Sequence, residues 1–176
     1  MAVPSIKTKR LFLRQIAQSD APALHGVLSD VNLMTWWSSA AHTTLAETEV
    51  YVGRNASDTD GWRCWAITTD GLQALGWVIL IEKRTGVAEI GYILSREYWG
   101  KGFASEAVSA VVAHGFDILR FRRIFADVDP ENASSIRLLE SIGFVREGRF
   151  RAEWETHIGV RDSLIFGLLK TDCPTT

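Results

Sequence analysis

The chain has 176 residues, a formal net charge of −2 and 23% charged residues. That length fits one domain with a well-buried core, and the near-neutral charge argues against a generic electrostatic grip on nucleic acid. No apolar run reaches membrane-spanning length, and the opening MAVPSIKTKR has no apolar signal core. We therefore expect a single domain over 1–176 in the cytoplasm, with neither nucleic acid nor a membrane as partner.

The expected elements begin with a strand over 6–16, where polar and apolar residues alternate. A helix with a Ser or Asp cap is predicted over about 20–29, and a second helix, opened by a Thr cap, ends near Ser57. Between the two helices, MTWWSSAAHTT is expected to be irregular. The sequence SDTDG after the second helix is expected to be a loop.

Three strands are predicted next, joined by short turn signals that are typical of an antiparallel meander; they are WRCWAITT, ALGWVILIE and VAEIGYIL. A long helix after Gly102, a strand RRIFADV and a helix ending at Gly143 follow. VREGRFRAEWE and DSLIFGLLK are expected to be two paired closing strands, and TDCPTT a frayed tail. This order predicts an α/β (α+β) domain with a mixed sheet. One crossover helix joins VAEIGYIL to RRIFADV, which favours a parallel pair.

The sequence YWGKGFASEA, residues 98–107, joins a predicted strand to the long helix. Glycine tolerates positive φ and lets a ligand reach the backbone, and the first N–H groups of a helix have no partner within it. These features favour an anion cradle suited to phosphate, with Lys101 adding positive charge at its rim. The alternative is a tight turn that needs glycine. The pattern matches neither the phosphate loop of nucleoside triphosphatases nor a dinucleotide fingerprint, which disfavours a nucleotide-binding domain.

YWGKGFASEA resembles the pyrophosphate-binding segment of the GNAT superfamily of acetyl-CoA-dependent N-acetyltransferases. It is most similar to the branch with the bacterial enzymes that acetylate ribosomal-protein N-termini at alanine or serine. KTKRLFLRQIAQSDAPAL resembles the opening strand and helix of that branch, AEIGYIL the strand before the cradle, and NASSIRLLESIGFVREG the late helix and strand entry. These segments keep the family's order over about 8–169. The resemblance implies a GNAT-like, mostly antiparallel sheet of about seven strands flanked by helices.

The resemblance also implies acetyl-CoA as the cofactor, with CoA as product and no metal. Backbone N–H groups around Ile93 and Leu94, where the family's strand splays, are expected to hold the thioester and the pantetheine arm. Asn132 is expected on the pantetheine side, with a plain helix cap as the alternative. The phosphate cradle is expected to comprise Trp99, Gly100, Lys101, Gly102, Phe103 and Ala104. The family often has Arg or Gln where Trp99 stands, which weakens any claim that this side chain contacts phosphate.

The implied reaction is direct attack of a primary amine on acetyl-CoA in a ternary complex. The attacking amine, with a pKa of about 10, must lose a proton, and the departing thiolate benefits from an acid. Glu89 lies within an apolar strand and is the predicted base, directly or through water; the alternative is an ion pair with a neighbouring strand. Ser135 is the acid that the resemblance implies, with water as the alternative. Tyr92 is set aside because strand alternation points it away from the face of Glu89.

Trp36 and Trp37 lie in the irregular stretch that borders the acceptor site in this superfamily. They are expected to form an apolar wall with a possible cation–π surface for an ammonium, unless one of them only covers the edge of the core. The acceptor is expected to be a peptide α-amine or a small amine, and the protein a monomer or homodimer. The alternative function is a non-catalytic acyl-CoA-binding sensor or interaction module.

Cys64 and Cys173 are far apart, which predicts neither a disulfide framework nor a metal site. His25, His42 and His157 show no spacing typical of metal ligands. No metal is therefore expected.

Overall fold

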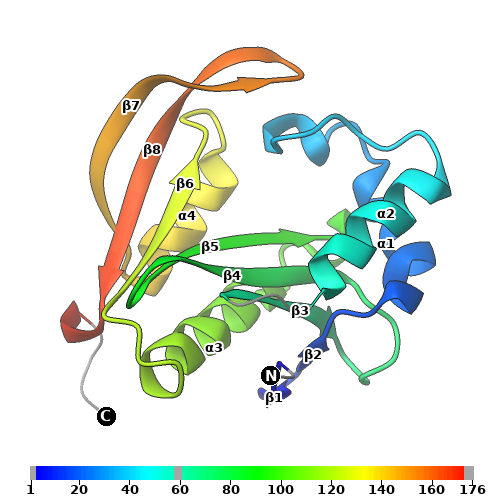
Figure 1. Cartoon of the computed structure of the whole chain (residues 1–176), viewed down its shortest axis with the longest axis horizontal. Helices are drawn as coiled ribbons and strands as arrows, with labels where there is room; N and C mark the ends of the chain where they lie inside the picture. The colour runs from blue at the N-terminus through cyan, green and yellow to red at the C-terminus, as the bar shows by residue number, and fades with distance from the viewer. Residues whose placement is uncertain (1–2, 58–60, 173–176) are drawn as a thin grey trace.

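The computed structural model describes residues 3–57 and 61–172. Within these ranges the chain forms one eight-stranded sheet flanked by helices (Figure 1), with the strand order β1-β2-β3-β4-β5-β6-β8-β7. The predicted mixed, mostly antiparallel fold is confirmed, with eight strands where about seven were expected. No helix in the described ranges is long and apolar enough to cross a membrane.

The strands are β1 (Ile6–Lys7), β2 (Phe12–Gln15), β3 (Trp62–Thr68), β4 (Gly76–Arg84), β5 (Val87–Leu94), β6 (Arg123–Val128), β7 (Val145–Thr156) and β8 (Gly159–Leu169). The α-helices are α1 (Ala21–Leu28), α2 (Leu45–Ala56), α3 (Phe103–Asp117) and α4 (Ala133–Ile142). The short 3₁₀ helices are η1 (Gln18–Asp20), η2 (Met34–Trp36), η3 (Arg96–Tyr98) and η4 (Lys170–Asp172). Parts of the predicted SDTDG loop and TDCPTT tail, residues 58–60 and 173–176, lie outside the described residues, as does Cys173.

The extra strand arises because the segment 6–16 is not one strand. The Thr8 N–H donates to the Leu11 carbonyl over 2.9 Å, and the Leu11 N–H donates to the Thr8 hydroxyl over 2.9 Å. These bonds close a turn that folds β1 back on β2. Alternation of polar and apolar residues continues through the turn, so periodicity alone does not reveal it.

The sheet carries a hydrophobic core on each face. On one face α3 and α4 pack against the strands, with Trp65 and Leu80 fully buried among them. On the other face α1 and α2 pack around Trp77, and Figure 1 shows these two helices together on the side of the sheet away from α3. Each α-helix is therefore fixed to the sheet by apolar burial rather than by helix propensity alone.

The ladder between β5 and β6 is short. The two strands are parallel, as predicted, but pair only from Val87 with Arg123 to Glu89 with Phe125. Beyond these pairs β5 stays bonded to β4 as far as Leu94, while β6 diverges and pairs with β8. Alternate N–H groups at the end of β5 are therefore left without a ladder partner on that side, and the sheet opens there.

The closing strands β7 and β8 pair as predicted, and they form an antiparallel hairpin. The ladder pairs Phe150 with Ser163 and then Trp154 with Arg161, so β7 carries two extra residues between these pairs. Ala152, at the centre of this bulge, has a φ of 51°. Bulges increase the local twist of a strand, and Figure 1 shows the hairpin curving beyond the end of β6 toward the segment that precedes α2.

Candidate active site

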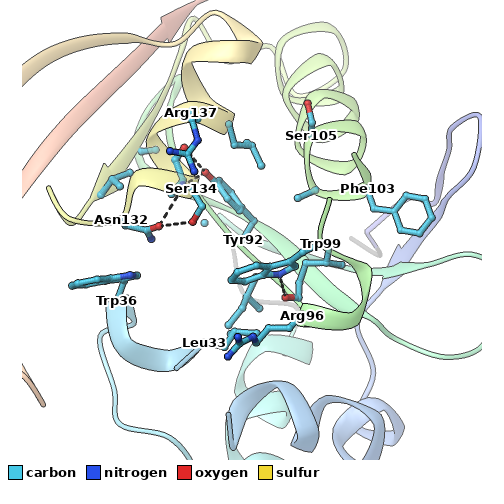
Figure 2. A pocket seen from close by; sticks show the side chains of 18 of the residues that line it. Leu33, Trp36, Tyr92, Arg96, Trp99, Phe103, Ser105, Asn132, Ser134 and Arg137 are labelled. Carbon is cyan, nitrogen blue, oxygen red and sulfur yellow. Dashed lines mark hydrogen bonds between the residues drawn. The ribbon is translucent and has the colours of Figure 1, made fainter. Parts of the chain in front are cut away.

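A cavity of about 690 Å³ lies at the opening between β5 and β6. Its walls come from the end of β5, the end of β6, the start of α3, the first turns of α4, and η2. Figure 2 shows Trp36 at one end of the cavity, Ser105 of α3 at the other, and Tyr92 between them. The unpaired backbone of β5 thus faces a volume in the range that small-molecule ligands occupy.

The glycine segment forms the turn into α3 at one end of this cavity. Gly100 and Gly102 have φ values of 72° and 76°, and Gly102 is the N-cap of the helix. Only glycine adopts this conformation without strain, and a Cβ at Gly100 would meet no protein atom within 4 Å. The predicted cradle residues on the cavity wall are Trp99, Gly100, Gly102, Phe103 and Ala104. An open cradle at a helix N-terminus fits the pyrophosphate of acetyl-CoA.

The cradle is held from outside by Arg10, in the turn between β1 and β2. Arg10 Nη1 donates to the Lys101 carbonyl over 2.7 Å, and Arg10 Nε lies 2.7 Å from a carboxylate oxygen of Glu106. The Lys101 ammonium lies 5.0 Å from the ring centroid of Tyr98, and Lys101 is not among the residues that line the cavity. The Trp99 indole N–H donates to the Leu94 carbonyl over 2.7 Å, so this side chain fixes the end of β5.

Ile93 and Leu94 line the cavity, as does Asn132 at the start of α4. The Asn132 side-chain oxygen accepts the backbone N–H of Ser135 over 3.2 Å, which makes Asn132 the helix cap that the sequence left open as an alternative. Its place on the wall and its role as a cap are compatible, because its amide N–H₂ is not used by the cap.

Tyr92 and Ser135 meet on the cavity wall, with their hydroxyl oxygens 2.6 Å apart. Burial raises the pKa of Tyr92 to about 12, against the opposing hydrogen bond with Ser135, so the phenol is neutral at physiological pH. As strand alternation predicts, Tyr92 and Glu89 lie on opposite faces of the sheet. Tyr92 is on the face against which α4 packs, and for this reason it lies beside Ser135.

Glu89 lies outside the cavity wall. It is in the part of β5 that still pairs with β6, opposite Phe125. Its carboxylate is 3.1 Å from the Lys83 ammonium on β4, which is the ion pair that the sequence left open as the alternative. A catalytic role for Glu89 stays a prediction that this position does not support.

The two predicted tryptophans both line the cavity, and Figure 2 places Trp36 at the end away from Phe103 and Ser105 of α3. The Arg161 guanidinium of β8 lies 5.6 Å from the ring centroid of Trp36. Trp37 meets Trp77 edge to face at 5.8 Å and donates its indole N–H to the Tyr51 hydroxyl over 3.3 Å. Trp37 therefore also covers the edge of the core, whereas Trp36 reaches across to the hairpin.

Asp127 and Asp129, which the sequence analysis did not select, also line this end. Asp127 accepts the Trp154 indole N–H over 2.9 Å and the Ser163 hydroxyl. The only signal in the sequence was a carboxylate inside the apolar strand RRIFADV, the same signal that led to Glu89. The contact with Trp154 depends on the bulge in β7 and cannot be read from spacing.

Asp129 is bound by Arg161, whose Nε and Nη2 donate to the two carboxylate oxygens over 2.7 and 3.0 Å. Burial alone raises the pKa of Asp129. The hydrogen bonds from Arg161 and from the Glu131 N–H outweigh burial, and the pKa lies below its usual value. Arg161 Nη2 also lies 3.1 Å from a Glu131 carboxylate oxygen. One guanidinium thus joins β8 to the loop that leads into α4.

No group of three or more His, Cys, Asp or Glu side chains within residues 3–57 and 61–172 could hold a metal ion.

Comparison with known proteins identifies the family. The family model described as an acetyltransferase (GNAT) domain matches residues 10–145. The uncharacterized N-acetyltransferase p20 of Bacillus licheniformis is 34% identical over 173 residues, which cover 96% of this chain and 97% of that protein. The chain belongs to the GNAT acetyltransferase family, and this membership supports an acetyl-CoA-dependent N-acetyltransferase.

Solved structures of similar proteins support the same family assignment. A GNAT-family acetyltransferase from Bacillus anthracis has a TM-score of 0.86 at 28% identity, covering 96% of this chain and 99% of the other. The spermidine N-acetyltransferase from Vibrio cholerae, solved in complex with CoA and spermine, has a TM-score of 0.81 at 26% identity, covering 94% and 98%. Because these relatives include spermidine acetyltransferases, the comparisons establish the superfamily, and the narrower resemblance to ribosomal-protein acetyltransferases stays a prediction.

Proposed function

We propose that this protein transfers the acetyl group of acetyl-CoA to the primary amine of a small molecule in a ternary complex. The observation that carries the proposal is one continuous cavity, with a helix-terminal anion cradle at one end and carboxylates with tryptophans at the other. A cradle suits a pyrophosphate, and a carboxylate beside aromatic rings suits an ammonium. The name of the Vibrio cholerae relative, a spermidine N-acetyltransferase, supports a small amine rather than a peptide.

The binding of acetyl-CoA is assigned to backbone groups. The first N–H groups of α3, at Phe103 and Ala104, have no acceptor within the helix and would bind the pyrophosphate. Because the Ser95 N–H donates to the Leu75 carbonyl, strand alternation points the Ile93 N–H toward β4 and the Leu94 N–H toward the gap, where it would bind the pantetheine arm or the thioester carbonyl. Bound there, acetyl-CoA supplies an activated acetyl group.

Tyr92 and Ser135 are assigned to the departing sulfur. If the neutral Tyr92 phenol donates to Ser135 Oγ, the Ser135 hydroxyl proton is free to point into the cavity. A phenol with a pKa of about 12 is a poor proton donor to a thiolate with a pKa of about 8.5. We therefore assign the pair to hydrogen-bond stabilisation of the developing thiolate, with Ser135 in contact and Tyr92 orienting it.

Asp127 is assigned to the amine. Its carboxylate lines the cavity at the end that holds Trp36, and two neutral donors fix its orientation. It can bind the incoming ammonium. Once that ammonium has lost one proton to solvent, Asp127 can accept a further proton from the neutral nitrogen as the nitrogen bonds to the acetyl carbon. Glu89, in its ion pair with Lys83, is the competing candidate for the base.

The test is acetyl transfer to a pool of primary amines, amino acids, polyamines and short peptides, read by mass spectrometry and by release of free thiol. A small amine gaining one acetyl group supports the proposal, and acetylation of the peptides alone contradicts it. Binding of acetyl-CoA without any product would favour the non-catalytic sensor.

A further inference from the structure

The charged side chains on the cavity wall differ in how they are compensated. They are Arg96, Asp127, Asp129 and Arg137. Asp129 is bound by the Arg161 guanidinium. Arg96 lies 3.7 Å from an Asp30 carboxylate oxygen. The Arg137 guanidinium forms no hydrogen bond or ion pair with residues 3–57 and 61–172, so it is a cation on the wall whose counter-charge these residues do not supply.

Arg137 belongs to a stripe on α4 that continues the cavity wall away from the acceptor end. The α4 residues that line the cavity share one face of the helix and are Ser134, Ser135, Arg137, Leu138 and Ser141. From Ser134 to Ser141 this stripe covers about 10 Å of the helix axis. The first turn of α3 lines the same cavity, and Figure 2 shows Arg137 and Ser105 on the opposite side of Tyr92 from Trp36. The cavity is therefore bounded by both helices there, with a free guanidinium on its α4 side.

We propose that Arg137 binds the 3′-phosphate of acetyl-CoA and selects this cofactor over its dephosphorylated form. The inference rests on the proposed binding of acetyl-CoA in this cavity and deepens it. The backbone N–H groups at the start of α3 are assigned to the pyrophosphate, which leaves the 3′-phosphate without a partner. A phosphate monoester carries about −1.5 to −2 charges at neutral pH, and a guanidinium matches its oxygens with two parallel N–H donors.

The neighbouring charges leave Arg137 available for this role. Glu140 lies one turn further along α4, does not line the cavity and forms no ion pair with Arg137. Lys101 of the glycine segment also lies off the cavity wall, with its ammonium against the ring of Tyr98. The cation at this end of the wall is therefore the Arg137 guanidinium.

The test is calorimetric titration of the protein with CoA and with 3′-dephospho-CoA, which differ in this phosphate alone. Hydrogen bonds between charged groups contribute roughly tenfold to a hundredfold to a binding constant. Because Arg137 is exposed to solvent, we expect the lower part of this range. The wild type should bind CoA about tenfold more tightly than 3′-dephospho-CoA at low salt, and this preference should decrease as salt is raised.

The decisive variant is Arg137→Gln, which removes the charge. Its preference for CoA should fall to less than about threefold, while its Kd for 3′-dephospho-CoA stays that of the wild type. Arg137→Lys keeps the charge and should keep most of the preference. Arg146→Gln is the matched control, because Arg146 is an exposed arginine on β7, close in sequence to α4, and does not line the cavity.

Melting temperatures of all variants check the folding. An equal loss of affinity for both ligands in Arg137→Gln would assign Arg137 to another part of the cofactor and overturn the inference. An unchanged preference for CoA in that variant, or no preference in the wild type, would also overturn it. These outcomes leave the proposed function intact, because the titration contains no amine. Binding of neither ligand by the wild type would overturn both.

Discussion

Replacing Asp127 by Asn tests the assignment of the base most directly. Asn keeps the shape of the side chain, and its oxygen can still accept the Trp154 indole N–H, while the Ser163 hydroxyl can rotate to accept from the new amide. The fold should therefore be kept and the negative charge lost. General-base catalysis contributes about 10²- to 10⁴-fold, so kcat/KM for the amine should fall at least about a hundredfold, with the KM for acetyl-CoA changed less than about threefold.

Glu89→Gln is the comparison. The Glu89–Lys83 pair is partly exposed, with side-chain exposures of 26% and 47%, and such pairs contribute about 0–1 kcal/mol to stability. The Glu89→Gln substitution, which removes this pair, should lower kcat/KM less than about threefold. The assay for both variants is free-thiol release at saturating acetyl-CoA, with circular dichroism as a check on folding. A large loss in Glu89→Gln together with near-normal Asp127→Asn would refute the assignment of Asp127 and restore Glu89 as the base.

Three further predictions concern the cradle, the hydroxyl pair and the acceptor wall. Gly102→Ala places a Cβ at a φ of 76° and 3.3 Å from Arg10 Nη2; we expect about 1 kcal/mol lower stability and weaker acetyl-CoA binding, measured by calorimetry. Tyr92 has a pKa of about 12 folded and about 10 unfolded, so the stability this burial confers is complete below pH 10 and is lost as pH rises to 12. Between pH 9 and 12, Tyr92 should lower the free energy of unfolding of the wild type by roughly 2–3 kcal/mol, and urea unfolding of Tyr92→Phe should show no such loss. The contribution of Tyr51 should be the same in both proteins. Trp36→Ala should raise the KM for the amine about tenfold and leave the KM for acetyl-CoA unchanged in steady-state kinetics; equal changes in both would contradict its place at the acceptor end.

Most of the fold is readable from local chemistry. The turn signal Asp70-Gly71 and the single crossover helix specify a meander and a parallel pair without reference to tertiary structure, and both are present. The turn between β1 and β2 was missed because its closing bonds involve the Thr8 side chain, which periodicity does not register.

The candidate site was predicted unevenly, for a physical reason. The cradle depends on backbone conformation, and glycine reports that conformation in the sequence. Whether a carboxylate on β5 or β6 reaches the cavity depends on where these two strands separate. Glu89 and Asp127 look alike in sequence, but Glu89 lies before the strands separate and Asp127 after. The partner of Tyr92 was missed because it comes from α4, across the gap that this separation opens.

The short ladder between β5 and β6 divides the sheet into two blocks, β1–β5 and β6–β8, which share backbone bonding over three residue pairs. A molecule that lies in the gap contacts both blocks at once and can replace the hydrogen bonds that the two strands do not form with each other there. Its binding free energy then adds to the cohesion of the whole sheet, in proportion to the logarithm of its concentration above Kd. The gap in which the protein would bind its cofactor is thus also a place where two parts of the sheet share few backbone bonds, so a molecule bound there should raise the stability of the folded protein.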